Sequence, residues 1–287
     1  MTPQSSTLKV PGASLYYEMR GSGPVLLIIP GGPQDAGVFA DVAGHLADRY
    51  TVVAYDPRGN SRSTFDGEPQ EQDLDVHGDD AARLIEALGA GPAYVFGTSG
   101  GAQIGLNLAA RHPGRVRALV AHEPPSMMLL DDPSPSLAGM RDLHDTYRSQ
   151  GVEAAMQKFF SENGLSEGAD HDEAGPHDAG PQDGPPSFEP SPEEAETFAR
   201  VSGNFEYWLA HGVMPLSLYR PDIEALRGRP VVVGIGEESV GQPIDGMGKA
   251  LADRLGSKRA AFPGDHMGFA PYPDRFAETL HLALSGA

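Results

Sequence analysis

The sequence predicts an α/β protein in which helices flank a mostly parallel sheet. Apolar runs of strand length alternate with segments whose apolar residues recur at helical spacing, as at residues 25–29, 35–49 and 51–55. The run at 25–29 is apolar at every position, which is typical of a parallel strand buried on both faces. A chain of 287 residues suits one such domain with an insertion better than two equal domains. This alternation of strands and helices predicts a parallel sheet.

Eight strands are expected in the sheet. The alternating pattern at residues 7–19 predicts an antiparallel pair that turns at Pro11-Gly12. The other six strands are expected at residues 25–29, 51–55, 94–96, 116–121, 231–235 and 259–262. Helices are expected at residues 35–49, 73–88, directly after Ser99, and at 137–150, 152–160, 191–211, 243–255 and 272–284. Arg58, in the polar loop at 56–63, is interpreted as a structural residue that ties down the edge of the sheet.

The alternation of strands and helices lapses between residues 125 and 218. This segment follows the sixth strand, so we expect it to form a helical lid over the carboxyl end of the sheet. The core is then formed by residues 1–124 and 219–287. Within the lid, residues 162–190 are rich in Gly, Pro, Asp and Glu and contain almost no apolar side chain. Such a segment cannot bury enough surface to offset its ordering entropy, which predicts a flexible acidic loop.

Composition narrows the classes of partner. The formal net charge of −19 argues against nucleic acid and anionic membranes, and there is no cysteine for a disulfide or a thiolate metal site. The N-terminus is polar and no apolar run approaches the length of a membrane span. We therefore expect a soluble, cytoplasmic protein that acts on a small molecule without a metal or another cofactor. The oligomeric state stays open, a homodimer included.

The residues around Ser99 carry the clearest chemical signal. A strand-length run leads into Gly97-Thr98-Ser99-Gly100-Gly101, and a helical apolar pattern follows at once. Gly-x-Ser-x-Gly between a strand and a helix is the nucleophile elbow, in which a strained turn pushes the serine hydroxyl clear of the sheet. The N-terminus of the next helix also places backbone N–H groups where an oxyanion forms. Ser99 is therefore the predicted nucleophile.

Three further residues complete a predicted hydrolytic site. His266 lies in a Gly-rich loop after the last strand, in the chain order of serine first and histidine last, and is the predicted base. The acid has two candidates: Glu123, which ends the sixth strand before Pro124-Pro125, is favoured over Glu238, which follows the seventh. Gly32, in the loop after the strand at 25–29, is the predicted second oxyanion donor, because Pro33 has no N–H.

Together these motifs resemble those of the α/β-hydrolase superfamily. The resemblance covers residues 7–124 and 219–285, and within the superfamily the chain looks like the soluble bacterial esterases, proline iminopeptidases and cofactor-free haloperoxidases. It implies an α/β-hydrolase fold with an eight-stranded sheet, and an oxyanion hole made by Gly32 and Gly100. The chain departs from these groups at Pro30, where a histidine usually precedes the two glycines. A serine at the nucleophile position argues against dehalogenases and epoxide hydrolases, which resemble this chain but use aspartate there.

Three functions remain open at this point. The first is a serine hydrolase that cleaves a small ester, lactone or amide through an acyl-enzyme. The second is a non-hydrolytic enzyme on the same site, such as a perhydrolase, a haloperoxidase or a cyclase of secondary metabolism. The third, a binding protein with a decayed site, is disfavoured by the intact Ser99 and His266. The substrate pocket is expected to be lined by Phe205, Trp208 and Met267.

Overall fold

The computed structural model describes residues 3–89, 91–162 and 191–287. Within these residues one sheet runs in the order β1-β2-β4-β3-β6-β7-β8-β9, and β5 pairs with β2 at its edge. All eight predicted strands are present, and the ninth, β5, is only two residues long, too short for a sequence pattern to reveal. The strands are β1 (Gln4–Val10), β2 (Ala13–Arg20), β3 (Val25–Ile29), β4 (Thr51–Tyr55), β5 (Thr64–Phe65), β6 (Ala93–Thr98), β7 (Val116–His122), β8 (Val231–Gly236) and β9 (Lys258–Phe262).

The sheet is antiparallel at one edge and parallel elsewhere. β2 pairs antiparallel with β1 and with β4, whereas β4, β3, β6, β7, β8 and β9 are all parallel to one another. β3 and β6 are neighbours in the sheet. From β3 the chain continues to β4, towards one edge of the sheet, and from β6 it continues to β7, towards the opposite edge. The adjacent carboxyl ends of β3 and β6 therefore form a topological switch point, where open α/β sheets bind their ligands.

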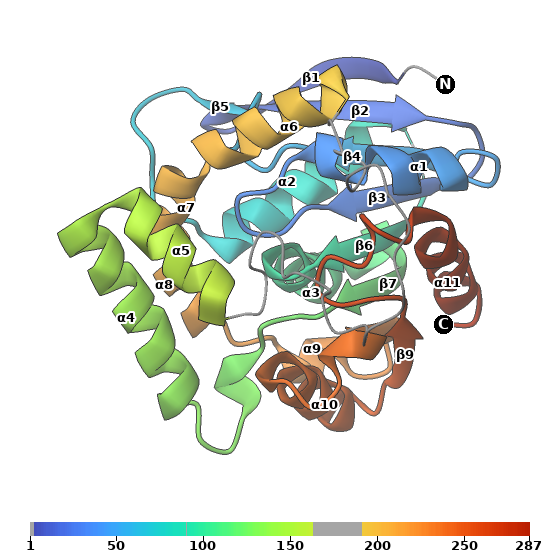
Figure 1. The fold of residues 1–287 in the computed structure, drawn as a ribbon. Helices are drawn as coiled ribbons and strands as arrows, with labels where there is room; N and C mark the ends of the chain where they lie inside the picture. The colour runs from blue at the N-terminus through green and yellow to red at the C-terminus, as the bar shows by residue number, and fades with distance from the viewer. Residues whose placement is uncertain (1–2, 90, 163–190) are drawn as a thin grey trace, which may run out of the picture.

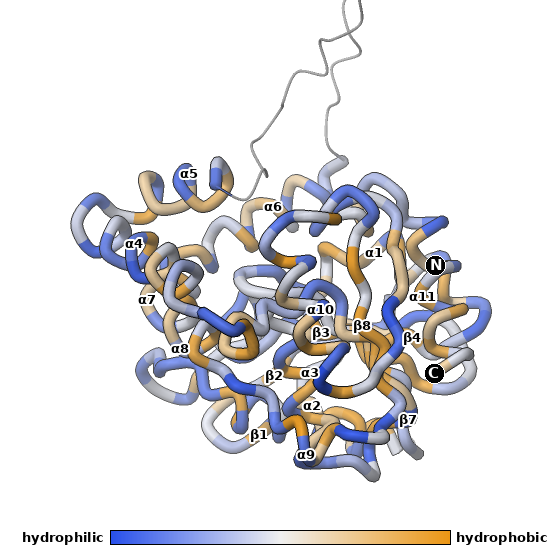
Figure 2. The backbone as a smooth tube through the Cα atoms, turned by 90° about the horizontal axis from the view of Figure 1, so that it is seen from below, coloured by the Kyte–Doolittle hydropathy of each residue, from blue (hydrophilic) through white to orange (hydrophobic). Residues whose placement is uncertain are grey.

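Helices cover both faces of this sheet (Figure 1). Alternate residues of β3 enter different cores: Leu26 and Ile28 pack with α1 and α11, while Leu27 and Ile29 pack with α2, α3 and α10. The hydrophobic stretches of the chain accordingly converge on the strands in the middle of the molecule (Figure 2). The helices are α1 (Ala40–Leu46), α2 (Leu74–Ala87), α3 (Gly100–Arg111), α10 (Pro243–Leu255) and α11 (Pro273–Ser285).

Arg58 is a structural residue, as its loop position predicts. Its guanidinium donates to both carboxylate oxygens of Asp80 on α2, at 2.7 and 2.8 Å, and to the carbonyl of Pro11 at 3.2 Å. Both side chains are buried. The pair therefore fastens helix α2 to the turn between β1 and β2.

A helical segment lies between β7 and β8. It contains α4 (Ser134–Gln150), α5 (Val152–Glu162), α6 (Pro192–Gly203), α7 (Phe205–His211), α8 (Val213–Leu218) and α9 (Ile223–Leu226). The single helix expected at residues 191–211 is wrong, because the chain breaks at Asn204 into α6 and α7. The predicted flexible loop at 162–190 lies, beyond Glu162, outside the described residues. Four single-turn helices complete the described chain: η1 (Ala36–Phe39), η2 (Pro113–Arg115), η3 (Met127–Leu129) and η4 (Glu237–Ser239).

Candidate active site

Ser99 lies at a sharp turn between β6 and α3. Its backbone has φ 53° and ψ −125°, a conformation that costs a non-glycine residue about 1–3 kcal/mol and occurs mostly at functional sites. The turn requires glycine on both sides: a Cβ at Gly97 would lie 2.3 Å from the carbonyl oxygen of Gly101, and one at Gly101 would lie 2.1 Å from that of Ile29. This packing holds Ser99 at the carboxyl end of the sheet, on the wall of a cavity.

The loop after β3 passes directly against this turn. Gly31 is so close that a Cβ there would lie 2.8 Å from the Cβ of Ser99. The backbone nitrogen of Gly32 lies 3.3 Å from the position that a Cβ at Gly100 would occupy, and Gly32 has a positive φ of 50°. Gly32 and Gly100 line the same cavity as Ser99. Two backbone segments that carry N–H groups thus meet beside the serine, the arrangement that an oxyanion hole needs.

His266 and Glu123 form a direct pair. His266 lies in the loop between β9 and α11, and its Nδ1 is 2.7 Å from Oε2 of Glu123. Glu123 follows β7 directly, has a positive φ of 45°, is fully buried and accepts a hydrogen bond of 2.8 Å from the Gly236 N–H. The structure does not bring the alternative acid to the histidine, because Glu238 is exposed and its N–H donates to the carbonyl of Gly264.

The environment of Glu123 keeps its carboxylate ionised. Burial alone would raise its pKa, but the hydrogen bond to His266, the electrostatic influence of the His122 and His266 rings and the Gly236 N–H together lower the pKa to about 2. An ionised Glu123 accepts the proton on Nδ1 of His266 and leaves Nε2 free to act as a base. Burial lowers the pKa of the neighbouring His122 to about 3, so His122 stays neutral at physiological pH.

The cavity beside Ser99 has a volume of about 200 Å³. Trp208 lines this cavity. Its indole Nε1 lies 3.4 Å from the position that a Cβ at Gly32 would occupy. Phe205 lies elsewhere, against Phe160 in a separate hollow, and Met267 packs beside Gln34 at the rim of the His266 loop rather than in the cavity lining. The wall is otherwise mostly apolar and comes from several helices: Met127, Met140, Phe159, Val213, Leu216, Ile244 and Met247.

Most of this wall was not predicted from the sequence. Met140, Leu216 and Met247 come from α4, α8 and α10, which are far apart in the chain. On each helix only one face meets the cavity, and the apolar pattern does not distinguish that face from one packed on the core. The available sequence signal is the presence of methionines in these segments, because methionine has a flexible side chain that suits binding surfaces.

Comparison with known proteins identifies the family of this chain. A family model described as alpha/beta hydrolase fold matches residues 24–163. YraK, an uncharacterized hydrolase of Bacillus subtilis, is 34% identical over 99% of this chain and 97% of its own length. The chain belongs to the α/β-hydrolase superfamily. The zearalenone hydrolase of Bionectria ochroleuca is 27% identical to this hydrolase over 95% of each protein. The enol-lactonase structure from Burkholderia xenovorans covers 98% of it, with a TM-score of 0.70 and 16% identity.

Among the described residues, no three His, Asp or Glu side chains lie close enough together to hold a metal ion. No helix in the same part of the chain has both the length and the apolar character needed to cross a bilayer. The polar residues that line the cavity include Ser99, Glu123 and His266, together with Ser217, Ser239, Gln242 and Glu162.

Proposed function

We propose that this hydrolase cleaves small esters, lactones or amides through an acyl-enzyme formed on Ser99. The observation that carries the proposal is the 2.7 Å contact between His266 and the buried Glu123, on the wall of the cavity that also holds Ser99. A nucleophile, a base and a group that orients the base are the parts that acyl transfer requires. The strained backbone of Ser99 and of Glu123 supports the same proposal.

The reaction proceeds in two halves. In the first, Ser99 Oγ attacks the substrate carbonyl carbon while Nε2 of His266 accepts the hydroxyl proton. The N–H groups of Gly32 and Gly100 stabilise the oxyanion, a contribution of about 10²–10³ in rate for each donor. His266 then returns the proton to the leaving alcohol or amine as its bond to the acyl carbon breaks. In the second half, water attacks the acyl-enzyme by the same route and releases the acid.

The cavity favours small, uncharged substrates. Its volume of about 200 Å³ is below the 300–1,000 Å³ typical of sites for drug-sized ligands. No lysine or arginine is among its described lining residues, and residues 163–190 contain neither type. A substrate carboxylate would therefore be desolvated without a cationic partner, close to Glu123. The enol-lactonase of Burkholderia xenovorans, which shares this fold, supports a cyclic ester as substrate.

The helices between β7 and β8 act as a lid in this proposal. Met140 of α4, Phe159 of α5, Trp208 of α7 and Leu216 of α8 all contribute to the cavity wall. This supports the division into a core of residues 1–124 and 219–287 and a lid of residues 125–218. Because the lid supplies most of the apolar wall, it is the part of the chain that sets substrate preference.

A fluorophosphonate probe combined with a matched pair of esters tests the proposal. The probe should attach to the peptide that contains Ser99, and phenyl acetate should be hydrolysed with a kcat/KM about 10-fold or more above that of monophenyl succinate, which carries a carboxylate. Product analysis should find free acid rather than a peracid or a cyclised product. Labelling of another residue, or a preference for the anionic ester, would contradict the assignment of the site or of the substrate class.

Replacing Trp208 with alanine should change substrate preference. The indole forms part of the cavity wall, so its removal should shift the relative kcat/KM of esters that differ in acyl size by about 10-fold or more. Phe205→Ala is the matched control, since this ring packs on Phe160 outside the cavity. A panel of acetate, butyrate and benzoate esters measures the preference, and thermal unfolding measures stability. If Trp208→Ala loses stability with an unchanged preference, the tryptophan is a core residue only.

A further inference from the structure

The loop that carries Gly32 is held in place mainly by side chains from other parts of the chain. We call residues 31–36 the oxyanion loop. Asn60 Nδ2 donates to the carbonyl of Gly32 at 2.9 Å and to that of Gln34 at 3.0 Å. The N–H of Ala36 donates to the buried carboxylate of Asp56 at 2.9 Å. These contacts fasten the inner side of the loop to the segment that follows β4.

Asn204 fastens the oxyanion loop to the helical segment. Its Nδ2 donates to the carbonyl of Pro33 and to Oγ of Ser61, both at 2.8 Å, and its Oδ1 accepts from the N–H of Ser61 at 2.7 Å. Asn204 is 5% exposed and lies at the break between α6 and α7. Ser61, like Ser99 and Glu123, has a positive φ, and the described chain has no other non-glycine residue in that conformation.

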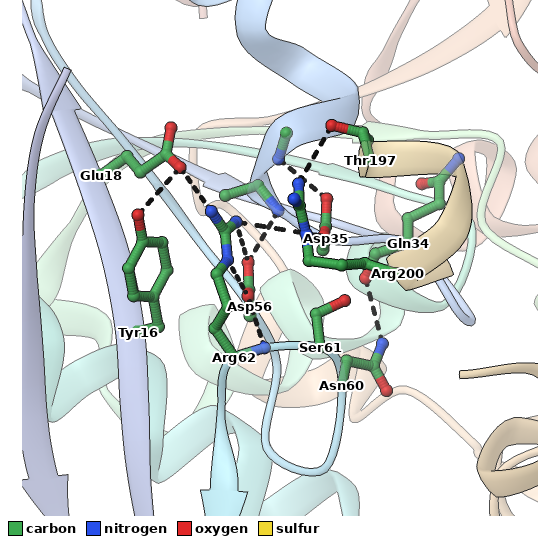
Figure 3. A network of polar contacts seen from close by, with 12 residues as sticks. Tyr16, Glu18, Gln34, Asp35, Asp56, Asn60, Ser61, Arg62, Thr197 and Arg200 are labelled. Atoms are coloured by element: carbon green, nitrogen blue, oxygen red, sulfur yellow. Dashed lines mark hydrogen bonds and ion pairs between the residues drawn. The ribbon is translucent and has the colours of Figure 1, made fainter. Parts of the chain in front are cut away.

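Arg200, one turn earlier on α6, makes a second attachment. Its Nε donates to the carboxylate of Asp35 at 2.7 Å, and its Nη2 donates to Oγ1 of Thr197 at 3.0 Å. Asp35 is fully buried and also accepts from the N–H of Gly37 at 2.9 Å, which starts the single turn η1. Figure 3 shows Arg200 beside the buried carboxylate of Asp35 and Arg62 beside that of Asp56.

Arg62 is a more distant partner of Asp35 than Arg200 is. The guanidinium of Arg62 donates to Asp56 through Nε and Nη2, at 2.8 and 2.9 Å, and to Glu18 through Nη1 at 2.7 Å. The backbone N–H of Arg62 also donates to Asp56, at 3.0 Å. The nearest nitrogen of Arg62 is 3.9 Å from the Asp35 carboxylate. Among the described side chains, the close charged partner of Asp35 is therefore the one that α6 supplies.

We propose that Arg200 and Asn204 are positioning residues through which α6 sets the geometry of the oxyanion hole. The inference rests on the proposed function, since it assigns a purpose to the Gly32 N–H. Arg200 holds the loop at Asp35 and Asn204 holds it at Pro33, on either side of Gln34 and close to the donor. An oxyanion hole acts through donors fixed in advance at the place where charge develops. A loop released from α6 would present the Gly32 N–H less accurately, while substrate would still enter the same apolar cavity.

The first test compares Arg200→Gln and Asn204→Ala with wild type. In both variants kcat for every neutral ester should fall about 10-fold to 100-fold, because a misplacement of about 1 Å can cost 10²-fold. KM should change by less than about 3-fold, since ground-state binding in the cavity is retained. Arg200→Lys, which keeps a cation beside Asp35, should recover most of the lost kcat. Glu196→Gln, at an exposed position on the same helix, should match wild type.

A pair of inhibitors gives a readout that a purely structural role would not change. An aryl trifluoromethyl ketone forms a bond from its carbonyl carbon to Ser99 Oγ, the serine proton passes to His266, and the former carbonyl oxygen becomes an oxyanion in the hole. The corresponding secondary alcohol cannot form this adduct and reports binding to the cavity alone. Both variants should bind the ketone about 10-fold to 100-fold more weakly, and the alcohol as tightly as wild type does.

Each remaining outcome overturns one of the two proposals. If the variants lose only thermal stability, with kcat and ketone affinity unchanged well below their unfolding midpoints, Arg200 and Asn204 have no positioning role. An equal loss of affinity for ketone and alcohol would mean that the substitutions reshape the cavity, which also contradicts the inference. Because the two substitutions remove different contacts, either one decides the question if the other does not fold. A wild-type protein without ester turnover would instead overturn the proposed function.

Discussion

Replacing Ser99 with alanine should lower ester turnover by about 10³-fold or more. The alanine variant keeps the cavity and the oxyanion donors but has no oxygen to form the acyl-enzyme. The substitution removes only one hydroxyl, and the backbone at residue 99 is set by Gly97 and Gly101, so the fold should be retained. Steady-state hydrolysis of phenyl acetate measures the loss, and fluorophosphonate labelling should disappear with it.

A serine outside the cavity provides the matched control. Ser149 lies exposed on α4, where its hydroxyl donates to the carbonyl of Asp145 on its own helix. Ser149→Ala should hydrolyse esters and take up the probe at the wild-type rate. Turnover of Ser99→Ala close to that of wild type would show that the nucleophile is another residue, or that water attacks the substrate directly.

Replacing Glu123 with glutamine should lower turnover by about 10²–10⁴-fold. A glutamine amide can present a donor to Nδ1 of His266, which favours the tautomer whose Nε2 is protonated and cannot act as a base. The same change at Glu238 is the control, because that side chain is exposed and the buried contact with His266 is made by Glu123. A larger loss in Glu238→Gln than in Glu123→Gln would move the acid to the segment after β8.

Glu123 should also connect stability to pH. Its pKa is about 2 in the folded protein, below the ordinary value of 4.5, so its contribution is complete above pH 4.5 and is lost as the pH falls towards 2. The difference corresponds to about 3 kcal/mol of unfolding free energy. Urea unfolding of wild type and Glu123→Gln should therefore differ most near neutral pH and converge in acid. Burial lowers the pKa of His122, so its protonation also destabilises the folded protein in acid.

Local sequence patterns are enough to predict the strands and the turn at Ser99. An apolar run such as Val25–Ile29 is long enough only for a buried strand, and the glycines around Ser99 reflect steric limits within a few residues of backbone. The order of serine first and histidine last along the chain then led us to expect the loop of His266 beside Ser99 at the carboxyl end of the sheet. The strand β5 is only two residues long and contains no such pattern, so it was not predicted.

Contacts between segments that are distant in the chain depend on the tertiary structure. Glu123 and Glu238 both follow adjacent parallel strands, and only the path of the loop at His266 selects Glu123, 143 residues away. Trp208 meets the cavity whereas Phe205, three residues earlier on the same helix, packs on Phe160. The break between α6 and α7 also depends on residues that are distant in the chain. The backbone of Asn204 has helical angles, and its side chain bonds to Ser61 and to the carbonyl of Pro33. Such choices depend on which surfaces are brought together in three dimensions, and helical periodicity contains no information about that.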